Sequence, residues 1–200
     1  MKLPVEKLIN LDNRFKPIID KFGVIELENR ENPYHALVRA IIYQQLSGKA
    51  AGTIYGRFKG LFDNAHPTTL ELIKTPHEQL RSVGLSNRKA EYIKAIADFF
   101  EKHSYNKSDF EKMTDEEIRS KLINIRGIGH WTIDMFLMFT LKKLDIFPVL
   151  DLGIQKGFTK FCGLKNLPSE EIMLKESKKW KPYRSIAAQY FWKIADENKN

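Results

Sequence analysis

The chain has 200 residues and a mass of 23.3 kDa, enough for one large domain or two small ones that share a core. Hydrophobic residues make up 42% and charged residues 29%, which excludes a disordered chain, a collagen-like fibre and a low-complexity linker. With Cys162 as its one cysteine, the chain cannot form an internal disulfide, a four-thiolate zinc site or a cysteine-ligated iron–sulfur cluster. The formal net charge of +8 suits a polyanionic partner, although proteins without such a partner carry it too.

No targeting or membrane-spanning segment is visible in the sequence. The first residues, MKLPVEKLINLDNRF, lack the apolar core of a secretory signal peptide. No stretch reaches the ~20 apolar residues of a membrane span. We therefore expect an intracellular protein without a membrane partner, cytoplasmic in a bacterium or archaeon and nuclear in a eukaryote.

Helix signals recur along nearly the whole sequence, and the short stretch 23–27 is the one place with two-residue alternation. The sequence therefore predicts an all-α fold. Asn32 and Pro33 supply a cap and a first-turn proline for a buried helix over about 33–46. Further helices are expected over AAGTIYGRFKGLF, PTTLELIKT and PHEQLRSV, the last of which ends at Gly84.

The second half of the chain continues the helical pattern after one weak stretch. Ser86 caps a helix over RKAEYIKAIADFFEKH, and the pattern then weakens into a loop at 104–113. Thr114 and Glu117 form a capping box that opens the next helix. The loop is therefore the best candidate for an internal boundary.

The stretch LINIRGIGHW lies between two helical patterns and holds two glycines around one apolar residue. Gly127 and Gly129 accept positive φ without a Cβ clash, so the chain can turn sharply there. The backbone N–H groups and the dipole of the following helix favour an anion such as a nucleic-acid phosphate. A tight helix–helix turn whose glycines serve packing alone is the alternative. The expected phosphate-binding residues are Arg126, Gly127, Ile128, Gly129 and His130.

Asp151 lies further along, in the apolar segment FPVLDLGI. Pro148 prevents the preceding helix from continuing, and Asp151 can cap the next one, where N–H donors favour an ionised carboxylate. An N-cap aspartate without a chemical role is the plain alternative. The two interpretations are compatible, because a capped carboxylate on an apolar wall also stabilises a developing cation or acts as a base for water.

The segments IRGIGHWTIDMF and FPVLDLGIQKGF resemble the helix-hairpin-helix DNA glycosylases, and among these the DNA-3-methyladenine glycosylase II family. Similarity extends to IIYQQLSGKAAGTIYGRF, SVGLSNRKAEYIKAIA and WKPYRSIAAQYFWKIA, in the family's order. The resemblance implies two helical subdomains that flank a DNA-binding cleft. We expect an N-terminal segment 1–32 packing on the C-terminal helices, a helical bundle 33–113, and the hairpin with the C-terminal helices in 114–200.

The resemblance also implies an activity. In this family the aspartate of the FPxxDLG segment is the catalytic carboxylate, which corresponds to Asp151 here. Members that also cut the strand carry a lysine directly after the hairpin, where this chain has Trp131. The implied enzyme is monofunctional and hydrolyses the N-glycosidic bond of alkylated purines, such as 3-methyladenine and 7-methylguanine, in base excision repair. Alkylation makes the base a good leaving group, so one carboxylate can suffice.

Such enzymes rotate the target nucleotide into a pocket and fill the gap that it leaves. The turn at 44–47 matches the family's intercalating segment, with Gln45 and Leu46 as the candidate gap-filling side chains. By position alone, a plain helix C-terminus before Gly48 is the favoured interpretation, and the family match reverses that preference.

The base pocket is expected to contain aromatic rings, because a tryptophan face attracts a cationic base by ~0.5–2 kcal/mol. Trp131 and Trp180 are the candidate platforms, and Met135 stands where some relatives have an aromatic pocket residue. Tyr183 completes the expected pocket. Core burial is the plainer role of any aromatic side chain at helical spacing.

We expect no cofactor and no catalytic metal, because the five histidines show no spacing typical of a zinc site. By family analogy, the carbonyls of Ile123, Ile125 and Ile128 could hold a monovalent cation. The expected partner is double-stranded DNA with alkylated bases, bound by a monomer. Two alternatives stay open: a glycosylase for uracil, mismatched or oxidised bases, and a noncatalytic DNA-binding module.

Overall fold

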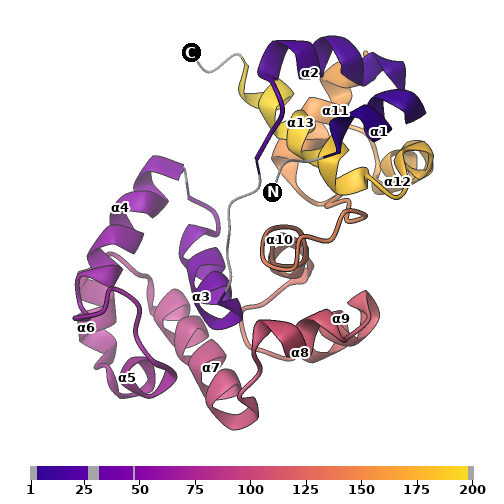
Figure 1. Ribbon diagram of the computed structural model, residues 1–200. Helices are drawn as coiled ribbons and strands as arrows, with labels where there is room; N and C mark the ends of the chain where they lie inside the picture. Colours follow the sequence, from indigo (N-terminus) through magenta and orange to yellow (C-terminus); the bar gives the residue numbers. More distant parts are fainter. Residues whose placement is uncertain (1–3, 27–31, 47, 198–200) are drawn as a thin grey trace. The chain divides into compact units, whose positions relative to one another are not determined.

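The computed structural model describes residues 4–26, 32–46 and 48–197 (Figure 1). Within these ranges the secondary-structure elements are all helices, which confirms the predicted all-α class. The chain divides into two compact units, one made of residues 30–136 and the other of residues 1–29 together with 137–200. None of the described helices is long and apolar enough to cross a membrane. Of the stretch 23–27, Leu27 lies outside the described residues.

In the unit 30–136, the long helix α7 (Asn87–His103) packs against α3 (Pro33–Tyr43) and α5 (Thr69–Lys74), as Figure 1 shows. Apolar residues every third or fourth position give α7 a buried face, which meets the largely buried α3. The remaining helices of this unit are α4 (Gly48–Lys59), α6 (His77–Ser82), α8 (Lys107–Glu111), α9 (Asp115–Leu122) and the start of α10 (His130–Phe139).

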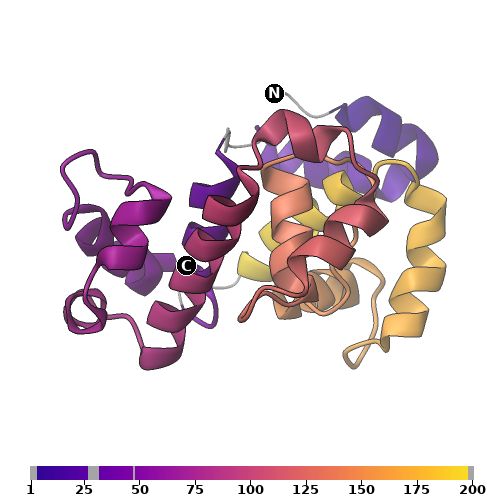
Figure 2. The ribbon, with the colours of Figure 1, turned by 90° about the horizontal axis from the view of Figure 1, so that it is seen from below.

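The other unit centres on the close pair α11 (Leu152–Phe161) and α13 (Arg184–Asp196). Gly157 makes this approach possible, because a Cβ on it would lie 1.9 Å from the carbonyl oxygen of Phe191. The N-terminal helices lie against α13, as the indigo and yellow ribbons in Figure 2 show. The other elements are α1 (Val5–Leu11), η1 (Asn13–Phe15), α2 (Lys16–Phe22), the end of α10, α12 (Glu170–Ser177) and η2 (Lys178–Trp180).

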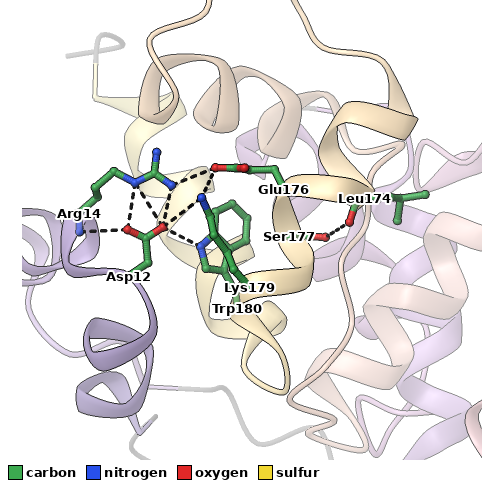
Figure 3. A network of polar contacts seen from close by, with 7 residues as sticks. All are labelled: Asp12, Arg14, Leu174, Glu176, Ser177, Lys179 and Trp180. Carbon is green, nitrogen blue, oxygen red and sulfur yellow. Dashed lines mark hydrogen bonds and ion pairs between the residues drawn. The ribbon is translucent and has the colours of Figure 1, made fainter.

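A polar network ties the N-terminal segment to the last helices of the same unit (Figure 3). Asp12 accepts a hydrogen bond of 2.9 Å from the indole Nε1 of Trp180. Arg14 donates to Asp12 at 2.7 Å and to Glu176 at 3.0 Å. Side-chain contacts therefore hold the N-terminal segment to η2 and α12.

The predicted helix boundaries agree with the structure wherever a local cap defines them. The capping box at Thr114 is formed, with the Thr114 amide donating to Glu117 Oε2 at 2.7 Å. Ser86 caps α7 by accepting from the Lys89 amide. Helix α3 ends at Tyr43 rather than near residue 46, because the chain reverses into a left-handed conformation at Gln45.

The stretch 104–113 is not the expected plain loop. It contains the short helix α8, which begins in a capping box formed by Asn106 and Asp109. The chain also divides after residue 136 rather than at residue 113. The physical reason is Phe110, which is fully buried with its ring 5.1 Å from that of Phe136 and 6.2 Å from that of Phe100. This ring joins α8 and the first part of α10 to the helices before them.

Candidate functional site

The predicted hairpin is a short turn between α9 and α10, held by its own backbone. The Ile125 amide donates to the Leu122 carbonyl and the Ile128 amide to the Ile125 carbonyl, each at 3.0 Å. Ile125 and Ile128 are 6% and 5% exposed, so both side chains anchor the turn in the unit's core. Helix α10 then opens with the Ile133 amide donating to the Gly129 carbonyl at 3.1 Å.

The two hairpin glycines have different roles. Gly127 has a φ of +91°, and a Cβ there would lie 2.1 Å from Cγ of Tyr92, so both conformation and space require glycine. Gly129 is not among the positive-φ glycines, and a Cβ built on it meets nothing within 4 Å. Gly129 is thus not needed for the fold, but its bare, exposed backbone allows another molecule to approach the start of α10 closely.

The start of α10 carries the features that an anion site needs. The amides of Gly129 and His130 have no partner within their own helix, as at any helix N-terminus, and both residues are exposed. Arg126 has a side chain 69% exposed and pairs with Glu91 at 2.9 Å. The expected cation ligands, the carbonyls of Ile123, Ile125 and Ile128, belong to this same turn, and their role stays a prediction.

The predicted gap-filling turn follows α3 in the same unit. Gln45 is exposed and has a φ of +56°, and Leu46 is 39% exposed. Ser47 lies outside the described residues. The sequence interpretation missed Gln44, whose side-chain amide donates to the hairpin carbonyl of Gly127 at 3.2 Å. No local motif marks such a bond, because its partners are far apart in the chain.

Asp151 is the N-cap of α11, as predicted. Its Oδ1 accepts hydrogen bonds from the Ile154 amide at 2.9 Å and from the indole Nε1 of Trp192 at 2.8 Å. The loop before it is fixed by Gln155, whose Nε2 donates to the Val149 carbonyl at 2.8 Å. The carboxylate is half-buried, so it is oriented by its neighbours and still partly exposed.

Trp192 is a site residue that the sequence interpretation left among possible core aromatics. It reaches Asp151 because Gly153 has no side chain: a Cβ there would lie 2.7 Å from Trp192 Cδ1 and 3.0 Å from Asp151 Oδ1. The indole also stacks on Phe139, with ring centroids 6.0 Å apart and an interplanar angle of 25°. In the sequence, the glycine that follows Asp151 and Leu152 in FPVLDLG was the one feature that could have indicated a close neighbour at this position.

The expectation that Trp180 forms a base platform is wrong. Its side chain is 0% exposed, and its ring lies within 6.0 Å of five phenylalanine rings of the same unit. Its indole N–H is already used by Asp12. A base could stack on it only if this aromatic core came apart. The rings concerned are those of Phe15, Phe147, Phe158, Phe161 and Phe191.

The other predicted pocket residues have different degrees of exposure. Trp131 and Tyr183 are half-buried, whereas Met135 is 7% exposed. Trp131 lies in the first turn of α10, directly after the hairpin, and Tyr183 immediately precedes α13. Within the described ranges no cluster of three or more His, Cys, Asp or Glu side chains could hold a metal ion.

Residues 38–182 match the profile of the family described as HhH-GPD superfamily base excision DNA repair protein. The chain belongs to this family. The matched range includes the turn after α3, the hairpin and Asp151, and it ends before Trp192.

Among individual proteins, the chain is similar to DNA-3-methyladenine glycosylase 1 of Schizosaccharomyces pombe, at 35% identity over 94% of this chain and 85% of the relative. A solved structure of the S. pombe 3-methyladenine DNA glycosylase in complex with abasic DNA superposes with a TM-score of 0.87 at 34% identity, covering 94% of each chain. The DNA-3-methyladenine glycosidase of Bacillus halodurans gives a TM-score of 0.82 at 35% identity, covering 96% of this chain and 89% of that one.

Proposed function

We propose that this protein is a monofunctional DNA glycosylase that flips alkylated purines, such as 3-methyladenine and 7-methylguanine, out of duplex DNA and hydrolyses their N-glycosidic bond. The observation that carries this is the carboxylate of Asp151, oriented by the Ile154 amide and the Trp192 indole in a chain of the HhH-GPD family. Relatives named as 3-methyladenine glycosylases at about a third identity over most of both chains support the choice of substrate.

The chemistry follows from charge development during the reaction. As the bond between the sugar C1′ and the purine nitrogen breaks, the sugar gains oxocarbenium character and the base leaves with the bonding electrons. The negative charge of Asp151 stabilises that cation, and water adds its oxygen to C1′ while its proton is released. A purine alkylated at N3 or N7 is already cationic and leaves as a neutral base, so no general acid is required.

The proposed contacts with DNA do not depend on the base sequence. The exposed amides at the start of α10, with Arg126 beside them, bind a backbone phosphate, and Gln45 or Leu46 fills the gap left by the flipped nucleotide. Trp131 supplies the aromatic face for the cationic base, and we assign further contacts with the base to Met135 and Tyr183. An enzyme of this kind acts on genomic DNA inside the cell, and we propose that it acts as a monomer.

Strand cleavage by members of this family requires an amine nucleophile. The position directly after the hairpin carries Trp131, whose indole cannot form a Schiff base with the abasic sugar. We therefore expect an intact abasic strand as the product, cleaved only after alkali treatment.

The test is base release from duplexes that contain 3-methyladenine or 7-methylguanine, followed in single-turnover conditions. Asp151→Asn should lower the rate by about 10²–10³-fold, because it removes the charge and keeps the shape, while affinity for an uncleavable abasic-site duplex stays within about twofold. Asp98→Asn, at an exposed position of α7, is the matched control and should cleave normally.

Parallel duplexes with hypoxanthine, uracil and 8-oxoguanine separate this proposal from its alternatives. Release of uracil or 8-oxoguanine without release of alkylated purines would assign another lesion. Tight binding with no release of any base would make the protein a noncatalytic module. Near-normal release by Asp151→Asn would remove the carboxylate from the mechanism.

A further inference from the structure

The turn after α3 and the hairpin before α10 are far apart in sequence but are joined by one side chain. Gln44 Nε2 donates to Thr132 Oγ1 at 2.8 Å and to the Gly127 carbonyl at 3.2 Å. Thr132 is 1% exposed, so this bond is made inside the unit and away from competing water. The segment that we assign to gap filling thus rests directly on the segment that we assign to phosphate binding.

A lysine from a third element, α7, also holds this turn. Lys89 Nζ donates to the carbonyl of Ile42 at 2.8 Å and to that of Gln44 at 2.7 Å. These carbonyls lie at the C-terminal end of α3, where a positive charge is favoured by the helix dipole. Burial lowers the pKa of Lys89 from its ordinary value, which indicates that the ammonium is drawn out of bulk water to make these bonds.

The first two turns of α7 contact the hairpin as well. Glu91 pairs with Arg126 at 2.9 Å, and the Tyr92 ring lies under Gly127, where a Cβ would be only 2.1 Å from its Cγ. Three nearby residues of one helix therefore contact both elements. The helix is a common support that fixes the turn and the hairpin with respect to each other.

The turn needs such support because its backbone is strained. Gln45 has a φ of +56°, a left-handed conformation that costs a residue with a side chain ~1–2 kcal/mol. A strained residue of this kind persists only where surrounding contacts determine it. The Gln44 amide and the Lys89 ammonium supply contacts on the residue immediately before it.

We propose that Gln44 and Lys89 are positioning residues that lock the gap-filling turn to the phosphate-binding hairpin, so that the gap-filling side chain enters the duplex at a set distance from the gripped phosphate. This inference rests on the proposed function and deepens it. Neither residue acts on the reacting bond. Their effect is on the preference for DNA with a vacated base position over undamaged DNA, and through it on the rate of base release.

The first test compares two duplexes, one undamaged and one with a tetrahydrofuran abasic site opposite 2-aminopurine, whose fluorescence reports insertion. Gln44→Ala should weaken binding to the abasic duplex about tenfold, the order expected for lost buried hydrogen bonds, and leave binding to undamaged DNA within about twofold. Gln79→Ala, in α6, is the control for a glutamine lost elsewhere in the unit and should change neither.

The second test is a double-mutant cycle that distinguishes a positioning role of Gln44 from an effect on overall stability alone. In the variant Gln45→Ala/Leu46→Ala the gap-filling side chains are gone, so adding Gln44→Ala should cause little further loss of abasic-site preference. If Gln44 acted only through overall stability, its loss would multiply the defect, and the melting temperature would fall in proportion.

Lysine variants test the other contact with a close match. Lys89→Met keeps the side-chain stem and removes the ammonium, and we expect about a tenfold loss of abasic-site preference. Lys94→Met is the control, because Lys94 is on the same helix and also donates to a helix-end carbonyl, that of Ile73 at 3.0 Å, away from the turn. Equal effects of the two variants would overturn the role of Lys89.

Failure of this inference can be distinguished from failure of the proposed function. If the wild-type protein neither prefers the abasic duplex nor releases alkylated bases, the proposed function fails. If the wild type does both and Gln44→Ala matches it in both duplexes, the glycosylase assignment stands and the locking role is wrong.

Discussion

Two aspartates in the same compact unit each accept a hydrogen bond from a tryptophan indole. Asp12 accepts from Trp180 at 2.9 Å, and Asp151 accepts from Trp192 at 2.8 Å. The two pairs use the same donor and acceptor at nearly the same distance. They differ in exposure: the Asp12 side chain is 8% exposed and closes a structural network, whereas Asp151 is half-buried and can be reached by another molecule.

Asp12 is surrounded by cations and closes a structural network (Figure 3). Arg14 donates to it at 2.7 Å, and Lys179 Nζ lies 3.7 Å from Oδ2. Burial acts to raise the pKa of Asp12, but hydrogen bonds from Arg14 and Trp180 outweigh it and hold the pKa at about 2. A negative charge neutralised by nearby cations contributes to stability but interacts only weakly with another molecule.

Asp151 Oδ1 accepts hydrogen bonds from the Ile154 backbone amide and the Trp192 indole, and the residue is only half-buried. These donors fix the direction of the carboxylate, and its partial exposure lets another molecule reach it. A fixed negative charge is the group that an oxocarbenium ion requires. An indole hydrogen bond to an aspartate therefore says less about the role of that aspartate than its exposure does.

The largest expected effect is on catalysis at the Asp151 pair. Trp192→Phe removes the indole N–H, keeps the aromatic contact with Phe139, and should lower the single-turnover rate of base release by about tenfold or more, as expected for a lost bond to a charged group. The rate, and not the affinity for an abasic-site duplex, should change. A rate within twofold of wild type would show that the indole does not orient the carboxylate.

The Asp12 pair should show the opposite behaviour, with stability lost and chemistry kept. Asp12→Asn should cost about 1–2 kcal/mol of unfolding free energy at neutral pH, a modest value because the Arg14 side chain is 46% exposed, and leave base release unchanged. The pKa of Asp12 is about 2 in the folded protein against an ordinary 3.8. The stabilisation is therefore present above pH ~4 and is lost as pH falls toward ~2.

Urea unfolding of wild type and Asp12→Asn between pH 2 and pH 7 measures this directly. The two stabilities should differ at pH 7 and converge toward pH ~2, where Asp12 becomes protonated. A difference that stays constant with pH would mean that the charge of Asp12 is not what stabilises the unit.

The smallest effect is expected from a glycine that lets Trp192 reach Asp151. Gly153→Ala adds a methyl group only 2.7 Å from Cδ1 of the Trp192 ring, which is too short for a carbon–carbon contact, so the indole must shift. We expect a loss of about threefold in rate, as for a weakened rather than deleted hydrogen bond. Gly56→Ala, at a helical glycine of α4 with open space around it, should leave the rate unchanged.

Local chemistry made part of this structure predictable. The capping box at Thr114, the cap at Ser86 and the cap at Asp151 all depend on residues a few positions apart, and all three form as expected. The glycine turn at Gly127 belongs to the same group, because its positive φ is a property of the turn itself. Helix α8 was missed because its cap at Asn106 lies in a stretch without an apolar stripe.

The sequence by itself determined where helices with a local cap begin, which turn exposes helix-end amides, and that Asp151 caps a helix. Tertiary structure decided that Trp180 is core while Trp192 reaches the carboxylate, and that Gln44 joins two distant turns. The physical reason is the separation along the chain of the residues that interact. A cap or turn is fixed by residues a few positions away. Which face of an aromatic helix is buried depends instead on the elements that happen to pack against it, here α11 and the N-terminal segment.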